Sequence, residues 1–467
     1  MIIQNDVTKR PDRDELLAAP PGGKAIRYDG HLAFGASLIV EQYRLHNGLR
    51  VLLMVDRAAP VVAYHTWFRV GSRHEHDGKT GIAHLLEHLM FGEFEGLAAG
   101  EFDRRLEECG AENNAATWVD WTFYHEQAPA DQLDVLIELE SKRMGQIVLR
   151  PKAVESEFEV VANERRFRVE DDVDGAASET LYATAFTCHG YRIPTIGWMA
   201  DIKGFVPEDC AAFYRTYYAP NNATLVIVGD INEVEVLRKI ATAYGYLESQ
   251  EIPVEDSHPE PPQVQEKVQE LAKPTETDKL NVGYHAPALG DFDHPALSLL
   301  VDVFTGGRAS RLYQVMQKEM EIATDARGFL GSFRDPGLLE FQVALRPGKT
   351  AEEALKVLDE QIALICENGV DQDELERAKA RAELGLLSGM ETASGKAEQI
   401  AFFDTVLGDP CGAFNRLEAL QKVTRSDMLR VARRYLTSSS RTVVIVHPQE
   451  GVEATETDSA DDEQEDA

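Results

Sequence analysis

Cysteine and positive charge are both scarce in this chain of 467 residues. The five cysteines are scattered, odd in number and without a CxxC pair, so a disulfide scaffold and a cysteine zinc site are not indicated. With 47 basic against 80 acidic residues, the formal net charge is -33, which would repel nucleic-acid phosphates and acidic membranes. We therefore expect no nucleic-acid partner, and charge favours basic peptides as ligands.

Long apolar segments are also absent from the sequence. No run approaches the roughly 18 apolar residues of a membrane span, so we expect none. The opening "MIIQNDVTKRPDRDELLAAPPGG" lacks the apolar core of a secretory signal, and its acidic residues argue against a mitochondrial leader. These features predict a cytoplasmic protein. The 43% hydrophobic content is globular, and the length predicts at least two domains.

Two stretches share one pattern at an offset of 218 residues, namely "YYAPNNATLVIVGD" from Tyr217 and "YLTSSSRTVVIVHP" from Tyr435. In each, a tyrosine at a predicted helix end precedes threonine and a β-branched run that predicts a strand. We interpret this as an internal duplication. The predicted fold class is α+β, with two duplicated domains, each a mixed or antiparallel sheet covered by helices.

Composition gives the expected domain bounds. The stretch 249–279 is rich in proline and glutamate and predicts a linker, whereas 450–467 holds nine acidic and no basic residues and predicts a disordered tail. The expected order is an N-terminal extension (1–37), a first α+β domain (38–248), the linker (249–279), a second α+β domain (280–449) and the acidic tail (450–467).

Periodicity predicts the main elements of the first domain. Alternation indicates strands over 48–56, 61–72 and 113–127, and helical spacing indicates helices over 81–91 and 130–148.

The helical stretch "GIAHLLEHLMF" contains the pattern HxxEH. On a helix, His84 and His88 share a face and can offer two imidazole nitrogens to one zinc ion, with the Glu87 carboxylate beside them as a base. The alternative is an amphipathic helix whose leucines face the core. Other histidines, namely His65, His74, His76 and His125, are interpreted as surface or packing residues.

HxxEH is the inverted form of the HExxH zinc-peptidase signature. Its surroundings, "GSRHEHDGKTGIAHLLEHLMF", "GAENNAATWVDWTFYHE", "ESEFEVVANERR" and "GGRASRLYQVMQKE", resemble the family of pitrilysin, insulin-degrading enzyme and mitochondrial processing peptidase. The resemblance runs through both predicted domains and implies a zinc endopeptidase with one ion per chain. It also implies that the two domains form half of a clamshell chamber.

The resemblance assigns roles to particular residues. His84, His88 and Glu164 would hold zinc, Glu87 would activate the attacking water, and Glu157 would orient the ligands. The strand around 113–127 would be an edge strand to which an extended peptide adds, with Asn114, Ala115 and Thr117 at the matching positions and Asn114 also near the scissile carbonyl.

The pattern of active relatives is broken in the second domain. Gln317 and Thr324 stand where the family has an arginine and a tyrosine that bind substrate, and neither can replace a guanidinium or a phenol. One inference is a heterodimer in which a homologous subunit provides this Arg/Tyr pair, so that the isolated chain is inactive or weak. The other is a non-catalytic assembly or core subunit of the same fold, which has no need for the base Glu87.

Overall fold

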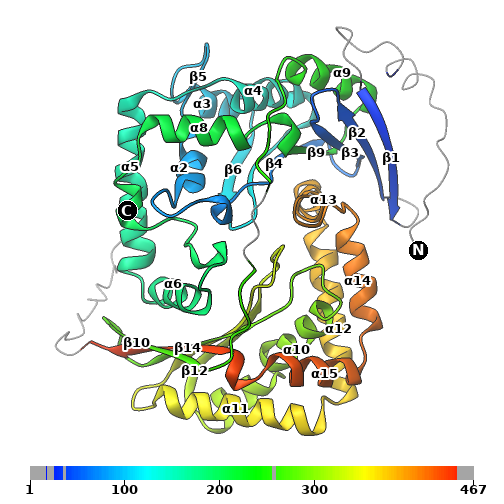
Figure 1. Cartoon of the computed structure of the whole chain (residues 1–467). Helices are drawn as coiled ribbons and strands as arrows, with labels where there is room; N and C mark the ends of the chain where they lie inside the picture. The colour runs from blue at the N-terminus through cyan, green and yellow to red at the C-terminus, as the bar shows by residue number, and fades with distance from the viewer. Residues whose placement is uncertain (1–16, 18–25, 35–37, 255–258, 450–467) are drawn as a thin grey trace, which may run out of the picture.

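The computed structural model describes residues 17, 26–34, 38–254 and 259–449, and it contains two mixed sheets, one in each half of the molecule (Figure 1). We call residues 26–254 the first half and 259–449 the second half. In spatial order the first sheet consists of β1 (Ile26–Phe34), β2 (Leu38–Leu45), β3 (Arg50–Val55), β9 (Ala223–Gly229), β4 (Val61–Phe68), β7 (Thr122–Pro129) and β6 (Glu112–Thr117). The second consists of β10 (Lys267–Lys273), β14 (Arg441–Pro448), β11 (Lys279–His285), β13 (Leu338–Leu345) and β12 (Ala323–Leu330).

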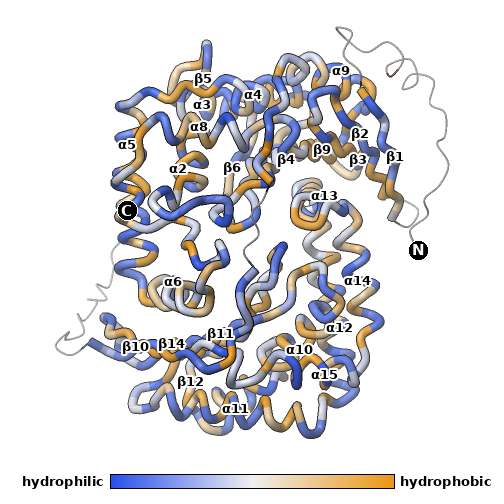
Figure 2. Tube along the Cα trace, viewed as in Figure 1, coloured by the Kyte–Doolittle hydropathy of each residue, from blue (hydrophilic) through white to orange (hydrophobic). Residues whose placement is uncertain are grey.

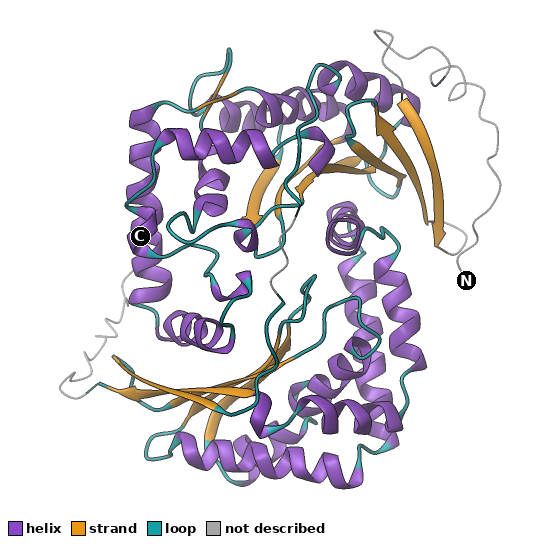
Figure 3. Cartoon of the chain, viewed as in Figure 1, coloured by secondary structure: helices purple, strands orange, loops and turns teal. Residues whose placement is uncertain are grey.

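Helices surround both sheets (Figure 3). Those of the first half are α2 (Ile82–Leu89), α3 (Glu101–Glu108), α4 (Leu133–Gly145), α5 (Pro151–Arg165), α6 (Val173–Ala185), α7 (Met199–Ile202), α8 (Pro207–Tyr217) and α9 (Glu233–Tyr244). Those of the second half are α10 (His294–Thr305), α11 (Ala351–Asn368), α12 (Gln372–Gly389), α13 (Ala393–Leu407), α14 (Gly412–Lys422) and α15 (Arg425–Tyr435).

The two sheets repeat one topology. The order β3-β9-β4-β7-β6 in the first sheet matches β10-β14-β11-β13-β12 in the second. The first pair is parallel in each sheet and the other three pairs are antiparallel. The helices α8 and α15 end at Tyr217 and Tyr435, where the repeat begins in the sequence. The predicted α+β class and the duplication are therefore confirmed.

The central strands of each sheet are buried on both faces because the halves exchange a helix. Along β4, Tyr64 and Phe68 face the core beneath α2 and α4, whereas Ala63 and Trp67 face α13 of the second half. In the reverse direction, α6 of the first half packs against β10, β11 and β14 (Figure 1). A strand buried on both faces reads as a continuous apolar run, which is how β9 and β14 appear in the sequence.

A buried carboxylate fixes α13 on the first sheet. Asp404 is fully buried and lies 3.1 Å from a guanidinium nitrogen of Arg50 and 3.1 Å from one of Arg69. The Thr224 hydroxyl donates a third contact to the same carboxylate, at 2.8 Å. The charge of Asp404 is thus compensated entirely by residues of the first half.

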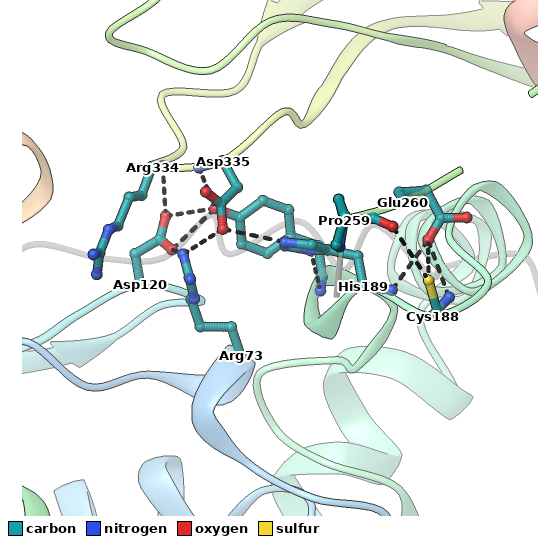
Figure 4. Close-up of polar contacts among 9 residues, drawn as sticks. Arg73, Asp120, Cys188, His189, Pro259, Glu260, Arg334 and Asp335 are labelled. Atoms are coloured by element: carbon teal, nitrogen blue, oxygen red, sulfur yellow. Dashed lines mark hydrogen bonds and ion pairs between the residues drawn. The ribbon is translucent and has the colours of Figure 1, made fainter. Parts of the chain in front are cut away.

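A second polar cluster joins the halves on the side of the β6–β7 turn (Figure 4). The Arg73 guanidinium lies 2.9 Å from Asp120, in that turn, and 2.9 Å from Asp335, in the loop between β12 and β13. The Tyr191 hydroxyl donates to Asp120 and accepts a hydrogen bond from the Asp335 backbone N–H. The backbone N–H of Arg334 also donates a hydrogen bond to the Asp120 carboxylate, at 3.0 Å. The turn is therefore tied to the second half.

Three sequence expectations require correction. The single strand expected over 113–127 is a hairpin, because residues 118–121 form a turn between β6 and β7. The expected N-terminal extension contains β1, which pairs with β2, and the expected linker contains β10, which pairs with β14. The acidic tail lies outside the described residues, and the domain bounds themselves stay a prediction.

The stretch that precedes β10, residues 259–266, is attached to the first half through Glu260 (Figure 4). Its carboxylate accepts hydrogen bonds from the backbone N–H groups of Thr187 (2.7 Å), Cys188 (3.0 Å) and His189 (3.0 Å), and from the Thr187 hydroxyl. Partial burial disfavours the charged carboxylate, but these donors outweigh burial and lower the pKa of Glu260 to about 2.

This contact predicts a pH-dependent stability effect. Because the folded-state pKa of Glu260 lies below its usual 4.5, its stabilisation is present above that pH and is lost as the pH falls through 2. We expect Glu260→Gln to lower the free energy of unfolding by about 1.5 kcal/mol at pH 7 and by less at about pH 3.5. Urea unfolding at both pH values checks this, with the exposed Glu251→Gln as control. An equal loss at both would contradict the ionic origin.

Hydrophobic and hydrophilic residues are interspersed along the helices (Figure 2). Within the described part of the chain, no helix is both long enough and apolar enough to cross a membrane.

Candidate metal centre

The helix α2 begins at a fixed point beneath the first sheet. The buried Glu75 carboxylate accepts hydrogen bonds from the backbone N–H groups of Gly81 (2.7 Å) and Ala83 (2.8 Å), which a helix start otherwise leaves unsatisfied. Gly81 has a φ of 92°, and a Cβ there would come within 2.5 Å of the Ile196 carbonyl oxygen. Only glycine fits this contact, so the position of the first turn is determined by the sequence.

The helix α2 combines an apolar side with two neighbouring imidazoles. Leu85, Leu86 and Leu89 are buried in the core of the first half, as an amphipathic helix requires. His84 and His88 lie one turn apart with ring centroids 4.9 Å from each other. The apolar side of α2 thus anchors the helix, which lies beside α5 (Figure 1), and both imidazoles lie near Glu164 of α5.

The helix α5 brings a carboxylate to these imidazoles. Oε2 of Glu164 lies 3.2 Å from Nε2 of His88 and 3.7 Å from Nε2 of His84. One ligand atom from each of the three residues lies within 4.8 Å of the others, a spacing that one metal ion could bridge. The structure thus brings together the three residues that the sequence predicts as zinc ligands.

The chemistry of this group fits a zinc ion. Two imidazole nitrogens and one carboxylate oxygen are a set that zinc accepts while keeping a fourth position for water. Oε2 of Glu164 is buried, and the atoms it faces in the described structure are the two Nε2 atoms. A cation at this position would satisfy that oxygen.

Burial and charge act in opposite directions on the two histidines. Burial lowers the pKa of His84 to about 4, which keeps its imidazole in the neutral form that binds metals. Burial also disfavours the charged form of His88, but Glu157 and Glu164 outweigh it and raise the pKa of His88 to about 9. Zinc binding would therefore release the proton of His88.

Glu87 lies at the same site without belonging to the ligand group. Burial raises the pKa of its carboxyl, and a hydrogen bond with Thr117 acts against this. Oε2 of Glu87 is buried and has no hydrogen-bond partner among the described residues. A raised pKa and an available oxygen are the properties of a carboxylate that takes up a proton during a reaction.

Two charged side chains surround the ligand group. Oε2 of Glu157 lies 3.6 Å from Nδ1 of His88, on the other side of the ring from Glu164, so it can orient this imidazole. Arg168 places its Nε 3.1 Å from Oε1 of Glu164. The sequence analysis missed Arg168, although its spacing of four residues from Glu164 would have indicated the pair.

The other candidate histidines lie elsewhere. His65 is buried on the α13 side of the sheet, 3.2 Å from the Ser394 hydroxyl, and its ring lies 5.3 Å from that of His125. His74 accepts a hydrogen bond from the Gly71 N–H, and His76 is exposed. None of them belongs to a potential metal-binding group in the described residues.

The predicted peptide-binding residues lie on β6, an edge strand of the first sheet. Asn114 and Ala115 occupy its middle, and Thr117 at its end reaches Glu87. One backbone edge of β6 pairs with β7 and the other has no neighbouring strand in the described structure. Such an edge can accept an extended peptide, although the binding roles of these residues stay a prediction.

Gln317 and Thr324 lie in the second half. Gln317 belongs to a short π-helix (Tyr313–Glu319), and Thr324 is an exposed residue of β12 whose hydroxyl donates to the Ala344 carbonyl oxygen. The two positions predicted to lack the Arg/Tyr pair therefore lie in regular secondary structure.

Comparisons with known proteins define the class. Residues 50–197 match the family described as Insulinase (Peptidase family M16), and residues 205–382 match the Peptidase M16 inactive domain. Together these matches span more than half of the chain. The chain therefore belongs to the M16 peptidase family, as the sequence motifs indicate.

Particular relatives agree with this class. The zinc protease PqqE of Helicobacter pylori is 29% identical over 435 residues, which cover 89% of this chain and 96% of the relative. The crystal structure of a protease from Helicobacter pylori superposes with a TM-score of 0.84 at 29% identity, over 88% of this chain and 99% of that one. The periplasmic protease PqqL of Escherichia coli shares the fold, with a TM-score of 0.73 at 19% identity, over 90% of this chain and 48% of that one.

Proposed function

We propose that this chain is the zinc-binding subunit of a metalloendopeptidase that hydrolyses peptides or unstructured segments, with one zinc ion per chain. The observation that carries the proposal is the convergence of His84, His88 and Glu164 beside the buried, unpaired oxygen of Glu87. Curated relatives named zinc proteases support it.

The mechanism assigns each step to a residue of the chain. Zinc held by His84, His88 and Glu164 would polarise the scissile carbonyl and make a water acidic enough to lose its proton near neutral pH. Glu87 accepts that proton and delivers it to the amide nitrogen of the leaving peptide. The edge of β6 pairs with the extended backbone, and Asn114, Ala115 and Thr117 lie along it. Glu157 holds the imidazole of His88 in orientation.

The proposal includes a homologous partner subunit. Gln317 and Thr324 cannot supply the guanidinium and phenol of the family pattern, so the partner would contribute them and close the chamber. The related PqqL chain supports this, since this chain corresponds to 48% of its length and one polypeptide there has room for two such units. We also propose that the complex prefers basic peptides and acts in the cytoplasm.

The test measures zinc content and cleavage of quenched-fluorescent peptides by the full chain, alone and after co-expression with its homologous subunit. We expect about one zinc per chain in both samples and cleavage only by the complex. Robust cleavage by the chain alone would remove the partner from the proposal. A zinc-loaded but inert complex would instead favour an assembly role.

A further inference from the structure

A cavity of about 490 Å³ lies where the two halves meet, away from the HxxEH motif of α2. Trp67 and Trp121 line it from the first half, and residues of α12, α13 and α14 line it from the second. Neither the zinc chemistry nor the pairing of a peptide with β6 uses these residues.

One wall of the cavity is aromatic. The rings of Trp67 and Trp121 have centroids 5.1 Å apart, and Phe402 of α13 lies 6.4 Å from Trp67 at an interplanar angle of 74°. Nε1 of Trp67 is buried and has no hydrogen-bond acceptor in the described structure. This wall suits an apolar or aromatic group that also carries an acceptor.

The guanidinium of Arg416 forms the polar part of the cavity, and a hydrogen bond to His294 holds it in place. Nε2 of the buried His294 lies 3.1 Å from the Gly331 carbonyl oxygen and must donate to it, so Nδ1 is an acceptor and receives a hydrogen bond from Arg416 at 2.9 Å. Arg416 has no carboxylate within ion-pair distance among the described residues, and burial lowers its pKa to about 10. The positive charge of Arg416 is therefore not balanced by a carboxylate of the described residues, and its position is fixed by His294.

Glu398 of α13 lines the same cavity and has no basic partner among the described residues, and burial raises the pKa of its carboxyl. It can accept a hydrogen bond from a ligand N–H. Gly385 of α12 also lines the cavity, and a Cβ there would meet no atom within 4 Å. The space beside Gly385 is thus open to a ligand.

Arg416 also borders a second cavity, of about 530 Å³, next to Phe292. Four carboxylates line that cavity, from Asp291, Asp409, Glu418 and Asp427, and they outnumber its basic residues Arg416, Lys422 and Arg430. They disfavour an anion there, whereas the first cavity has Glu398 as its single acidic residue. An anionic group therefore fits the first cavity better.

We propose that the cavity between Trp67, Trp121 and Arg416 binds an apolar α-amino acid unit through its free carboxylate. The carboxylate pairs with Arg416, the side chain packs on the aromatic wall, and the N–H donates to Glu398. This unit is either the C-terminal residue of a peptide or a free amino acid. The proposal does not depend on an active zinc site.

The experiment follows tryptophan fluorescence and titration heat while N-acetyl-phenylalanine is added to the full chain, before and after chelation of metals. We expect saturable binding that survives chelation, and N-acetyl-phenylalaninamide should bind at least about ten-fold more weakly because it lacks the charge. N-acetyl-phenylalanine binding that disappears on chelation would assign the carboxylate to the zinc site and overturn the proposal.

Two variants separate the contacts. In Arg416→Gln, the glutamine can still donate to His294. This variant should bind N-acetyl-phenylalanine only as tightly as the unaltered chain binds N-acetyl-phenylalaninamide. Its affinity for the amide should not change. Gly385→Leu should fill the cavity and abolish both, whereas Ala380→Leu, also exposed on the same helix but outside the cavity lining, should change neither. Equal affinity for acid and amide, or unaltered binding in both variants, would contradict the assignment.

Two further ligands identify the source of the carboxylate. Free phenylalanine that binds as tightly as the acetylated form assigns the cavity to amino acids. A peptide with a free C-terminal phenylalanine that binds more tightly than free phenylalanine, and more tightly than its amidated form, assigns it to peptide ends. The peptide titrations use the Glu87→Gln chain so that no cleavage occurs.

Discussion

Glu87→Gln is expected to reduce peptide hydrolysis by the complex of this chain with its partner by about 10²–10⁴-fold while zinc stays bound. Glutamine has the shape of glutamate but cannot accept the proton of the attacking water. The three predicted ligands come from other residues, so their geometry is preserved. Steady-state kinetics with a quenched-fluorescent peptide and metal analysis of the same samples check this.

The control is Glu159→Gln, which removes one carboxylate from an exposed position on α5. It should retain both zinc and full activity. Loss of zinc in the Glu87 variant would show that this carboxylate holds the site together, and full activity would exclude it as the base.

Asp404→Asn is expected to lower the free energy of unfolding by about 3 kcal/mol, because it leaves two arginines without their shared carboxylate. Arg50 and Arg69 are partly exposed, which places the loss at the lower end of the range for buried pairs. Chemical unfolding followed by tryptophan fluorescence measures it. The change should also loosen α13 from the first sheet, detectable as faster amide hydrogen exchange in that helix.

The matched control for Asp404 is Asp230→Asn, which breaks an exposed pair with Arg57. Exposed pairs contribute about 0–1 kcal/mol, so this variant should unfold close to the unaltered chain. Equal losses in the two variants would contradict the special role of the buried carboxylate.

The grouping of His84, His88 and Glu164 is partly predictable from the sequence because two of its three members are local. His84, Glu87 and His88 share one helix turn, and helical geometry alone brings the imidazoles together. Glu164 lies on another helix, and only the resemblance to a family identified it. Arg168 and Glu75 complete the surroundings through contacts that no motif marks.

The fold was predictable where periodicity is simple. The offset between Tyr217 and Tyr435 revealed the duplication, and the apolar runs of β9 and β14 marked central strands. The β6–β7 hairpin was missed because its turn, residues 118–121, contains three strand-favouring residues and neither glycine nor proline.

Long-range contacts account for the rest. Asp404 meets Arg69 across 335 positions of sequence, and the exchange of α6 and α13 also joins elements that lie far apart in the chain. Single-sequence patterns contain no information about such pairs. From the sequence alone, Arg416 would be interpreted as a surface charge on an amphipathic helix. Its hydrogen bond to His294 is visible only in the structure.

The exchange of helices between the halves also limits how the molecule can move. Since α13 is bound to the first sheet and α6 to the second, a hinge between the halves would have to pull each helix off the sheet that buries it. The chain is therefore built to move as one rigid body. If it forms half of a chamber, that chamber opens by separation of two subunits, and substrate entry becomes a property of the contact between them.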